Sequence, residues 1–348
     1  MGEFSEQLID WQHKHGRHDL PWQNTCDPYR IWLSEIMLQQ TQVNTVIPYY
    51  QRFLRRFPDL HALSNAPIND VLELWAGLGY YARARNLHRC AQAIVSDYQG
   101  VFPTSAETIA TLPGIGRSTA AAISAFAFGQ RAAILDGNVK RVLTRCFGIK
   151  GIPGSSETEK TLWKLAESLL PHKDIERYTQ GLMDLGASVC ARSKPRCPSC
   201  PMQEICIACF DGRQTELPLA KQKKVRPERE VTLMLLTDGK HVLLERRPPA
   251  GIWGGLLTLP EGEQSDAAQC AHQHGTRLLK VEQLNQIKHS FTHFRLLIQP
   301  LLCTVTPTGK SLNEPGWQWL SFDEIDNAAL AAPIKRLLLD LARNEEDG

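Results

Sequence analysis

Five cysteines lie close together in the sequence, between residues 190 and 209. Because the N-terminus shows no secretory apolar segment, we expect a reducing compartment, where clustered cysteines more often bind metal than form disulfides. Two ligand sets fit the spacing. Cys197, Cys200, Cys206 and Cys209 form C-x2-C-x5-C-x2-C, which suits a zinc knuckle. Cys190, Cys197, Cys200 and Cys206 form C-x6-C-x2-C-x5-C, which suits a [4Fe–4S] cluster, and the spacing alone does not choose between them.

Two carboxylates form a second candidate site. Glu35 sits in a helical run with apolar residues at i−4, i−3 and i+3, so lost hydration is expected to raise its pKa. Asp136 precedes a helix that begins near Asn138, where capping and the helix N-terminus are expected to keep its pKa low. The plainer interpretations are a Glu at the rim of an apolar face and a simple cap. Together, a proton donor and a persistent anion are what breaking a glycosidic bond requires.

A glycine turn adds a binding function. In Leu112-Pro-Gly114-Ile-Gly116-Arg-Ser118, two glycines allow a tight turn before an alanine-rich helix. The N–H groups at such a helix start can bind a phosphate. An ordinary turn is the alternative, but the preceding Leu-Pro and the following helix are typical of a helix-hairpin-helix element, which holds the DNA backbone without reading its sequence.

The surrounding elements predict two domains. Helical spacing of apolar residues continues to about residue 212, and residues 213–230 form a charged, proline-containing stretch that indicates a linker. From residue 231 the pattern changes to strands, with Asp238-Gly239 predicting a hairpin turn, and a helix follows Pro333. We therefore expect an all-α domain over 1–212, a linker over 213–230 and an α/β domain over 231–348.

Composition restricts the class of protein. The 348 residues are 43% hydrophobic and 22% charged, which excludes a disordered chain, and no apolar run could span a membrane. The net charge of +2 combines +2 in residues 1–212, +3 in the linker and −3 in residues 231–348. Cations beside the cysteines are expected to contact phosphates, so near-neutrality does not exclude a DNA partner: Arg192, Lys194 and Arg196.

Several segments together carry a family resemblance. They are Leu20-Pro21-Trp22, residues 32–42 (WLSEIMLQQTQ), residues 75–86 (WAGLGYYARARN), residues 134–142 (ILDGNVKRV) and the cysteine cluster. Across nearly the first 210 residues, the chain resembles the endonuclease III superfamily of DNA glycosylases and, within it, the adenine DNA glycosylases of the MutY type. The resemblance implies a [4Fe–4S] cluster on Cys190, Cys197, Cys200 and Cys206, with Cys209 as a spare.

The resemblance also implies a reaction. Members flip adenine out of an A·8-oxoguanine or A·G mispair in double-stranded DNA and cut its N-glycosidic bond, which leaves an abasic site. Glu35 would protonate adenine N7, Asp136 would stabilise the C1′ cation or its adduct, and Asn138 would position the site. Gln39 and Tyr80 match residues that wedge into the duplex. We further expect a monomer in the bacterial cytoplasm, at the nucleoid.

One position separates branches of the superfamily. Members that also nick DNA carry a lysine where this chain has Ser118, and serine cannot form a Schiff base. We therefore expect no efficient strand cleavage. A bifunctional glycosylase/lyase of another base specificity explains the hairpin and cysteines but not Ser118. A non-catalytic DNA-binding protein with a structural metal leaves the Glu35 carboxylate unexplained.

Residues 231–345 resemble a Nudix-like domain. Gly255-x5-Glu261 matches the start of the Nudix box, but Gln269-Cys270 and Gln273-His274 stand where metal-binding carboxylates are needed, so we expect no pyrophosphate hydrolysis. In adenine glycosylases this domain recognises 8-oxoguanine through a Phe-Ser-His loop. The corresponding residues of this chain are Phe291, Thr292 and His293.

Overall fold

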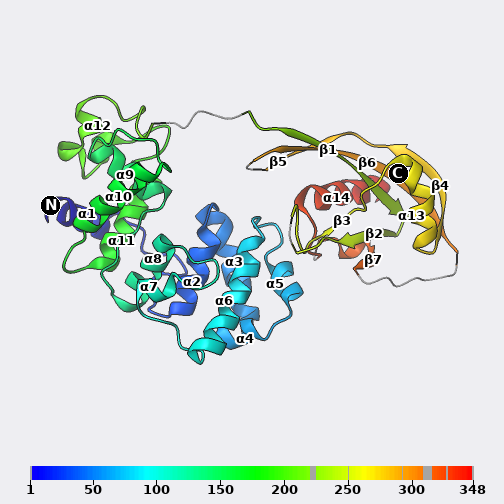
Figure 1. The fold of residues 1–348 in the computed structure, drawn as a ribbon, viewed down its shortest axis with the longest axis horizontal. Coiled ribbons are helices and arrows are strands. Elements are labelled where there is room, and N and C mark those ends of the chain that lie inside the picture. Colours follow the sequence, from blue (N-terminus) through cyan, green and yellow to red (C-terminus); the bar gives the residue numbers. More distant parts are fainter. Residues whose placement is uncertain are drawn as a thin grey trace. The chain divides into compact units, whose positions relative to one another are not determined.

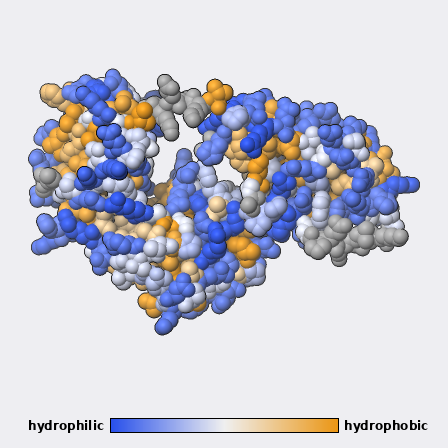
Figure 2. Space-filling model, viewed as in Figure 1, coloured by the Kyte–Doolittle hydropathy of each residue, from blue (hydrophilic) through white to orange (hydrophobic). Residues whose placement is uncertain are grey.

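The computed structural model describes residues 2–219, 225–249, 251–291, 293–308, 316–326 and 328–346 (Figure 1). The chain divides into a helical unit, residues 1–66 with 85–223, and a sheet unit, residues 67–84 with 224–348. The second break falls in the stretch predicted as a linker, and the exact domain boundaries stay a prediction. No helix among the described residues is both long and apolar enough to cross a membrane. On the face seen in Figure 2, hydrophilic residues predominate on both units.

The described part of residues 2–219 contains helices and no strand. The longer helices are α1 (Gly2–His15), α2 (Pro28–Leu38), α3 (Val43–Arg56), α6 (Ala82–Tyr98), α8 (Arg117–Phe128), α9 (Gly137–Cys146), α10 (Ser156–Ser168) and α11 (Ile175–Asp184). The shorter ones are α4 (Leu60–Ser64), α5 (Ile68–Leu74), α7 (Ala106–Ile109) and α12 (Ile207–Phe210). A π-helical turn, Leu185–Val189, extends α11 toward Cys190.

One apolar core packs five of the described helices together, including α8 and α9, which border the site. Side chains of α1, α8, α9, α10 and α11 pack in it, among them Leu8, Leu143, Leu162 and Leu182. Helices α1 and α11 approach closely because Gly181 has no side chain: a Cβ there would lie 3.1 Å from Leu8 Cγ. Burial of such leucines contributes roughly 1.5–3 kcal/mol each.

The hairpin between α7 and α8 needs one of its glycines for two reasons. Gly114 has φ +77°, a left-handed conformation, and a Cβ there would lie 2.5 Å from Asn86 Cβ. Gly116 caps α8 with φ −88°, and a Cβ added to it would meet nothing within 4 Å. Gly114 is therefore required by the fold, whereas the space in front of Gly116 is open.

The sheet unit is built around one mixed sheet. Its strands run in the order β3-β2-β1-β6-β4, with β5 paired to β6 and β7 to β2. Among the strands that the structure describes, β1 and β6 run parallel, and the other strand pairs are antiparallel. The strands are β1 (Glu228–Thr237), β2 (His241–Arg246), β3 (Leu257–Thr258), β4 (Thr276–Gln283), β5 (Ile287–Ser290), β6 (Arg295–Pro307) and β7 (Trp317–Ser321). Helix α13 (Ala267–Gln273) packs against the sheet, and α14 (Ala332–Glu346) buries Ile334 and Leu338.

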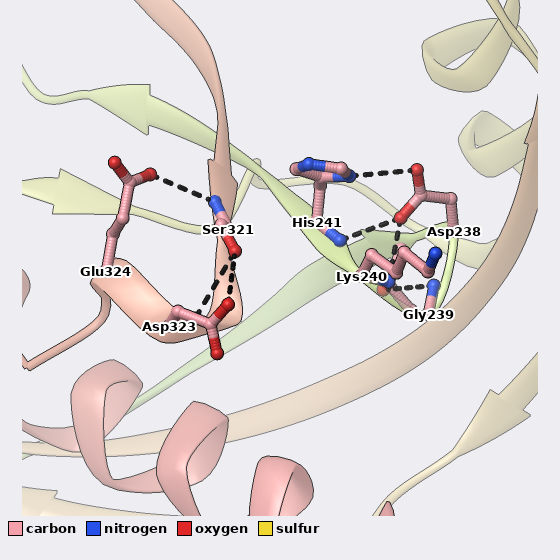
Figure 3. Close-up of polar contacts among 8 residues, drawn as sticks. Asp238, Gly239, Lys240, His241, Ser321, Asp323 and Glu324 are labelled. Carbon is pink, nitrogen blue, oxygen red and sulfur yellow. Dashed lines mark hydrogen bonds and ion pairs between the residues drawn. The ribbon is translucent and has the colours of Figure 1, made fainter.

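The predicted Asp-Gly hairpin is confirmed. Asp238 Oδ1 accepts hydrogen bonds from the backbone N–H groups of Lys240 (2.9 Å) and His241 (2.7 Å), and Gly239 takes φ +90° (Figure 3). Although burial alone would raise it, these bonds lower the pKa of Asp238 below its ordinary value. Nearby, Ser321 and Glu324 close a capping box at the end of β7 (Figure 3).

We expect the two hairpin glycines to respond differently to alanine. Gly114→Ala should lower the free energy of unfolding by about 2–5 kcal/mol, because it adds left-handed strain and a clash with Asn86. Gly116→Ala should change that free energy by about 0.5 kcal/mol or less. Urea denaturation of both variants checks this, and equal losses for the two would contradict it.

Candidate active site and cysteine cluster

The predicted catalytic residues of the helical unit meet at one cavity. Its volume is about 1430 Å³, and it is lined from α2, α8 and α9 by Glu35, Gln39, Ser118, Asp136 and Asn138. These residues are spread over a hundred positions of the sequence. The fold therefore brings together a carboxylic acid, a second carboxylate and three uncharged polar groups.

Glu35 lies in the last turn of α2. Asp27 caps the start of this helix by accepting a hydrogen bond from the Tyr29 N–H (2.9 Å). Its helix neighbours Trp32 and Ile36 are buried in the core. Burial, and then the nearby charge of Asp136, raises the pKa of Glu35 to about 8. The predicted upward shift is confirmed, so the carboxyl group is largely protonated at neutral pH.

Asp136 caps α9, as predicted, and its Oδ1 accepts a hydrogen bond from the Val139 N–H at 2.8 Å. The prediction of a lowered pKa is wrong. Burial raises the pKa of Asp136, and it outweighs the hydrogen bonds from the helix start and the nearby cations Arg141 and Lys140. The hydrogen bonds and cations act on Asp136 itself, so its ionised form has local support.

A second cavity of about 640 Å³ is also lined by Glu35. Much of its surface is apolar, with Trp22 and Ile31 among its lining residues. Leu38 and Val43, like Glu35, line both cavities.

An ion pair that sequence analysis missed lies at the same junction. Arg17 lines both cavities, and its backbone N–H and side chain bind the carboxylate of Asp184, which is only 2% exposed. Gln180 donates a further hydrogen bond to Asp184 Oδ1 (2.9 Å). The partners are 167 positions apart, so no local pattern could have revealed them.

Two predicted site residues, Ser118 and Gln39, tie neighbouring elements together. Ser118 Oγ accepts a hydrogen bond from the Leu135 N–H (2.9 Å), which fixes the segment before Asp136 against α8. Gln39 ends α2 and donates to Thr119 Oγ1 at 3.4 Å. Each tie joins parts of the cavity wall.

Asn138 packs tightly against Gly186: a Cβ added to Gly186 would lie 2.6 Å from the Asn138 Cβ. Its Oδ1 accepts a hydrogen bond from Arg141 Nη2 (2.9 Å), and Arg141 also donates to the Gly186 and Cys190 carbonyls. Asn138 therefore links the start of α9 to the turn that leads to the cysteines.

The predicted DNA contacts differ in exposure. The Leu112 side chain is buried, whereas Gly116 is open and no side chain caps α8 there. Tyr80 is 51% exposed, with φ +51°, in a turn closed by hydrogen bonds from Trp75 and Arg83 to the Gly79 carbonyl. An exposed aromatic ring on a strained, well-braced turn suits insertion into another molecule.

The cysteines surround a small cavity. It is lined by Cys190, Cys197, Cys200, Cys206 and Cys209, and also by Cys146 from the end of α9. Arg145 Nη1 donates to Cys190 Sγ (3.3 Å), and Arg145 also binds the carbonyls of Ala191, Arg192 and Leu217. Soft sulfur donors around an apolar space, with a guanidinium on one of them, fit an iron–sulfur cluster. In the described part of the chain, no three His, Cys, Asp or Glu residues are grouped to hold a metal ion.

The cations beside this loop are exposed. Arg192, Lys194 and Arg196 all face solvent, and Arg196 also donates to the Ser188 carbonyl (2.6 Å from Nη2). Arg192 lines the larger cavity near Asp136 and Asn138. Of the three, Arg192 is therefore the cation that borders the cavity with the candidate catalytic groups.

In the sheet unit, one of the predicted lesion-recognition residues, Phe291, lies in an aromatic cluster. Phe291 stacks on Phe294 with ring centroids 4.7 Å apart, and it also contacts His289 and Trp253. His293 is exposed, and Thr292 lies outside the described residues. Sequence analysis missed Trp253, whose position just before Gly255 was the available signal.

Comparisons with known proteins agree with this architecture. Residues 33–168 match the model of the HhH-GPD superfamily base excision DNA repair proteins, and residues 231–340 match the NUDIX domain. A solved thermostable thymine-DNA glycosylase has a TM-score of 0.54 and 32% identity, covering 60% of this chain and 95% of that one.

Two relatives extend the match over both domains. The adenine DNA glycosylase of Buchnera aphidicola (subspecies Baizongia pistaciae) is 36% identical over 98% of this chain and 97% of its own length. The human adenine DNA glycosylase is 31% identical over 96% of this chain and 73% of its own. Because this similarity runs through the HhH-GPD fold and the NUDIX domain alike, the chain belongs to the adenine DNA glycosylase family.

Proposed function

We propose that this protein is a base-excision-repair glycosylase that removes adenine paired with 8-oxoguanine or G and leaves an abasic site. The observation that carries this proposal is the position of Glu35, a protonated carboxyl group that lines the cavity containing Asp136 as well as a second, smaller cavity. An acid that holds its proton at neutral pH and a neighbouring carboxylate whose ionised form is supported by hydrogen bonds and cations divide the work of glycosidic bond cleavage.

The apolar cavity is the proposed pocket for the flipped adenine. Trp22, Leu38 and Val43 offer apolar surface to a planar base, and its 640 Å³ is within the usual range for small-ligand pockets. Glu35 at its border would donate a proton to adenine N7, so that adenine leaves as a neutral base. Extrusion costs a few kcal/mol, and a mispair lowers that cost.

Asp136 would face the sugar rather than the base. As the bond to adenine breaks, positive charge develops at C1′, and an ionised carboxylate stabilises it or captures it as an adduct. The Val139 N–H and the nearby cations support the ionised form despite burial. Asn138 acts through Arg141 as a positioning residue at the start of α9.

The DNA backbone is the proposed partner of the hairpin and the exposed cations. The open space at Gly116 admits a phosphate oxygen to the start of α8. Arg192, Lys194 and Arg196 would bind further phosphates, and Tyr80 and Gln39 would fill the gap left by the base. Such contacts set register and weaken as salt rises.

We propose that Cys190, Cys197, Cys200 and Cys206 hold a [4Fe–4S] cluster. Bound, it would link four points of the loop that carries the cations. Cys190 distinguishes this ligand set from the zinc-knuckle set, and it lines the same cavity as the other three, with its sulfur bound by Arg145. Arg145 would stabilise the Cys190 thiolate and hold the loop through its carbonyl contacts.

The residue at position 118 bears on the product of the reaction. Ser118 has no amine for a Schiff base, and its hydroxyl already binds the Leu135 N–H, so the product is an abasic site without strand cleavage.

In the sheet unit, Phe291, Thr292 and His293 would recognise 8-oxoguanine, with Trp253 and Phe294 supporting the Phe291 ring. We also place the protein, as a monomer, in the bacterial cytoplasm.

Duplexes with A opposite 8-oxoguanine, G or T test the function. We expect excision with the first two, and strand breaks only after alkali treatment, because an abasic site needs alkali to break. Gel analysis with and without alkali gives the readout. Breaks without alkali would instead favour the bifunctional glycosylase/lyase.

Glu35→Gln should fold and bind the A·8-oxoguanine duplex but lose excision by about 100-fold or more, because an amide cannot supply the proton. Single-turnover excision, with binding measured by electrophoretic shift, separates the two effects. Undiminished excision would remove Glu35 from the proposed mechanism.

Excision should fall as pH rises through about 8 in the free enzyme, because Glu35 loses its proton there. The same group also affects stability. The pKa of Glu35 is higher in the folded than in the unfolded protein. The stabilisation that its protonated form gives is therefore fully present below the unfolded pKa and is lost as pH rises through about 8. Glu35→Gln should therefore gain stability relative to wild type between pH 6 and 9, measured by urea denaturation at both values, and an unchanged difference would contradict the raised pKa.

A further inference from the structure

An arginine lies at the edge of the aromatic cluster in the sheet unit. Phe291 and Phe294 stack with ring centroids 4.7 Å apart, and the Cζ atom of Arg229 lies over the Phe294 ring, 4.7 Å from its centroid. Phe294 therefore contacts a guanidinium and a second ring at once. Trp253 and His289 belong to the same cluster through their contacts with Phe291.

The strand register places Arg229 beside these rings. Arg229 is the second residue of β1, and it pairs with Leu296 of β6, which pairs in turn with His289 of β5. Paired residues of neighbouring strands point to the same face of a sheet, so Arg229 and His289 share one face. The Arg295 N–H donates to the Pro227 carbonyl at 2.9 Å, which holds the start of β1 against β6.

The cluster also contains part of the loop proposed to recognise 8-oxoguanine. The Phe291 N–H donates to the Phe294 carbonyl at 2.9 Å, and this hydrogen bond closes the connection between β5 and β6. Phe291 is one of the proposed recognition residues, and Arg229 contacts the ring on which it stacks. The guanidinium is therefore one ring away from a residue proposed to contact the lesion.

The guanidinium of Arg229 is suited to binding an anion. Arg229 is exposed, and a guanidinium that stacks on a ring keeps N–H groups along its edge, whose fork geometry matches two phosphate oxygens. Stacking also restricts the side chain in advance, so less conformational entropy is lost when it binds. Burial lowers the pKa of His289, so this ring is neutral at pH 7 and adds no charge to the cluster.

Arg295 is a neighbouring arginine whose charge is already compensated. Its Nη1 atom lies 2.6 Å from Glu228 Oε1, and these two residues pair with each other across β1 and β6. Successive residues of a strand point to opposite faces, so this ion pair lies on the face away from Arg229. Among the residues that the structure describes, Arg229 itself forms no ion pair. Arg295 is therefore a matched control for Arg229.

We propose that Arg229 binds a backbone phosphate of the strand that carries 8-oxoguanine, and that its stacking on Phe294 fixes this contact relative to the recognition loop. This inference rests on the proposed recognition of 8-oxoguanine by the sheet unit. A phosphate contact carries no sequence information, so Arg229 sets the register of the strand while the loop distinguishes the base.

Binding of the A·8-oxoguanine duplex at several salt concentrations tests the contact. The full-length Glu35→Gln chain is the parent, so that the duplex stays intact during the measurement. Adding Arg229→Gln should weaken binding roughly 3- to 10-fold and reduce the slope of log Kd against log salt by about 1, as expected for one lost phosphate contact. Adding Arg295→Gln instead should leave the slope unchanged, because that charge is paired with Glu228.

The outcomes separate this inference from the proposed function. A parent that binds the A·8-oxoguanine and A·G duplexes equally overturns the recognition of 8-oxoguanine and this inference together. A parent that prefers 8-oxoguanine, with an Arg229→Gln variant that keeps the slope of the parent, overturns this inference alone. An equal reduction of the slope by Arg295→Gln also overturns it, because any arginine at this end of the sheet would then serve.

A second variant tests the role of the ring and decides the matter if Arg229→Gln does not fold. Arg229→Lys keeps the charge but loses the planar group that stacks on Phe294 and binds two oxygens. The slope should then equal that of the parent, while affinity for the A·8-oxoguanine duplex falls roughly 2- to 5-fold. An affinity equal to that of the parent would overturn the part that stacking plays.

Discussion

The desolvation of Glu35 is the constraint on which the rest of the helical unit depends. An isolated carboxylate in this position would lose its hydration without a cation to replace it, so the neutral acid is favoured. The raised pKa is kept only while α2 holds Glu35 in its buried position, because water would stabilise the carboxylate. The buried side chains of α2, among them Trp32, Leu33 and Met37, fix that position.

Contacts between distant segments also fix the residues that line the cavities. Ser118 fixes the segment before Asp136, Asn138 packs on Gly186, and Arg17 is bound by the buried carboxylate of Asp184. Arg17 has little freedom, because both its backbone N–H and its guanidinium are bound to this carboxylate. These ties also connect the carboxylates to the loop with the cysteines, since Arg141 binds both Asn138 and the Cys190 carbonyl.

Much of the fold could be predicted because its determinants are local. Helical spacing, the Asp136 cap and the Asp238-Gly239 turn depend on side chains within a few residues of each other, and each is present in the structure. The resemblance also named the residues that line the larger cavity. The direction of the Asp136 pKa shift could not be predicted, because the local hydrogen bonds that lower it are outweighed by burial among residues from other helices.

By itself, the sequence determined which residue types are available and how far apart they are along the chain: one acid in an apolar helix, one capping aspartate, a glycine hairpin and five closely spaced thiols. Only the tertiary structure decided what these groups share. It placed Glu35 on two cavities, paired Arg17 with Asp184, and directed Cys209 and Cys146 into the same space as the four proposed ligands. The physical reason is one of range: caps and turns form between near neighbours, whereas burial and shared cavities sum contributions from segments far apart in the chain.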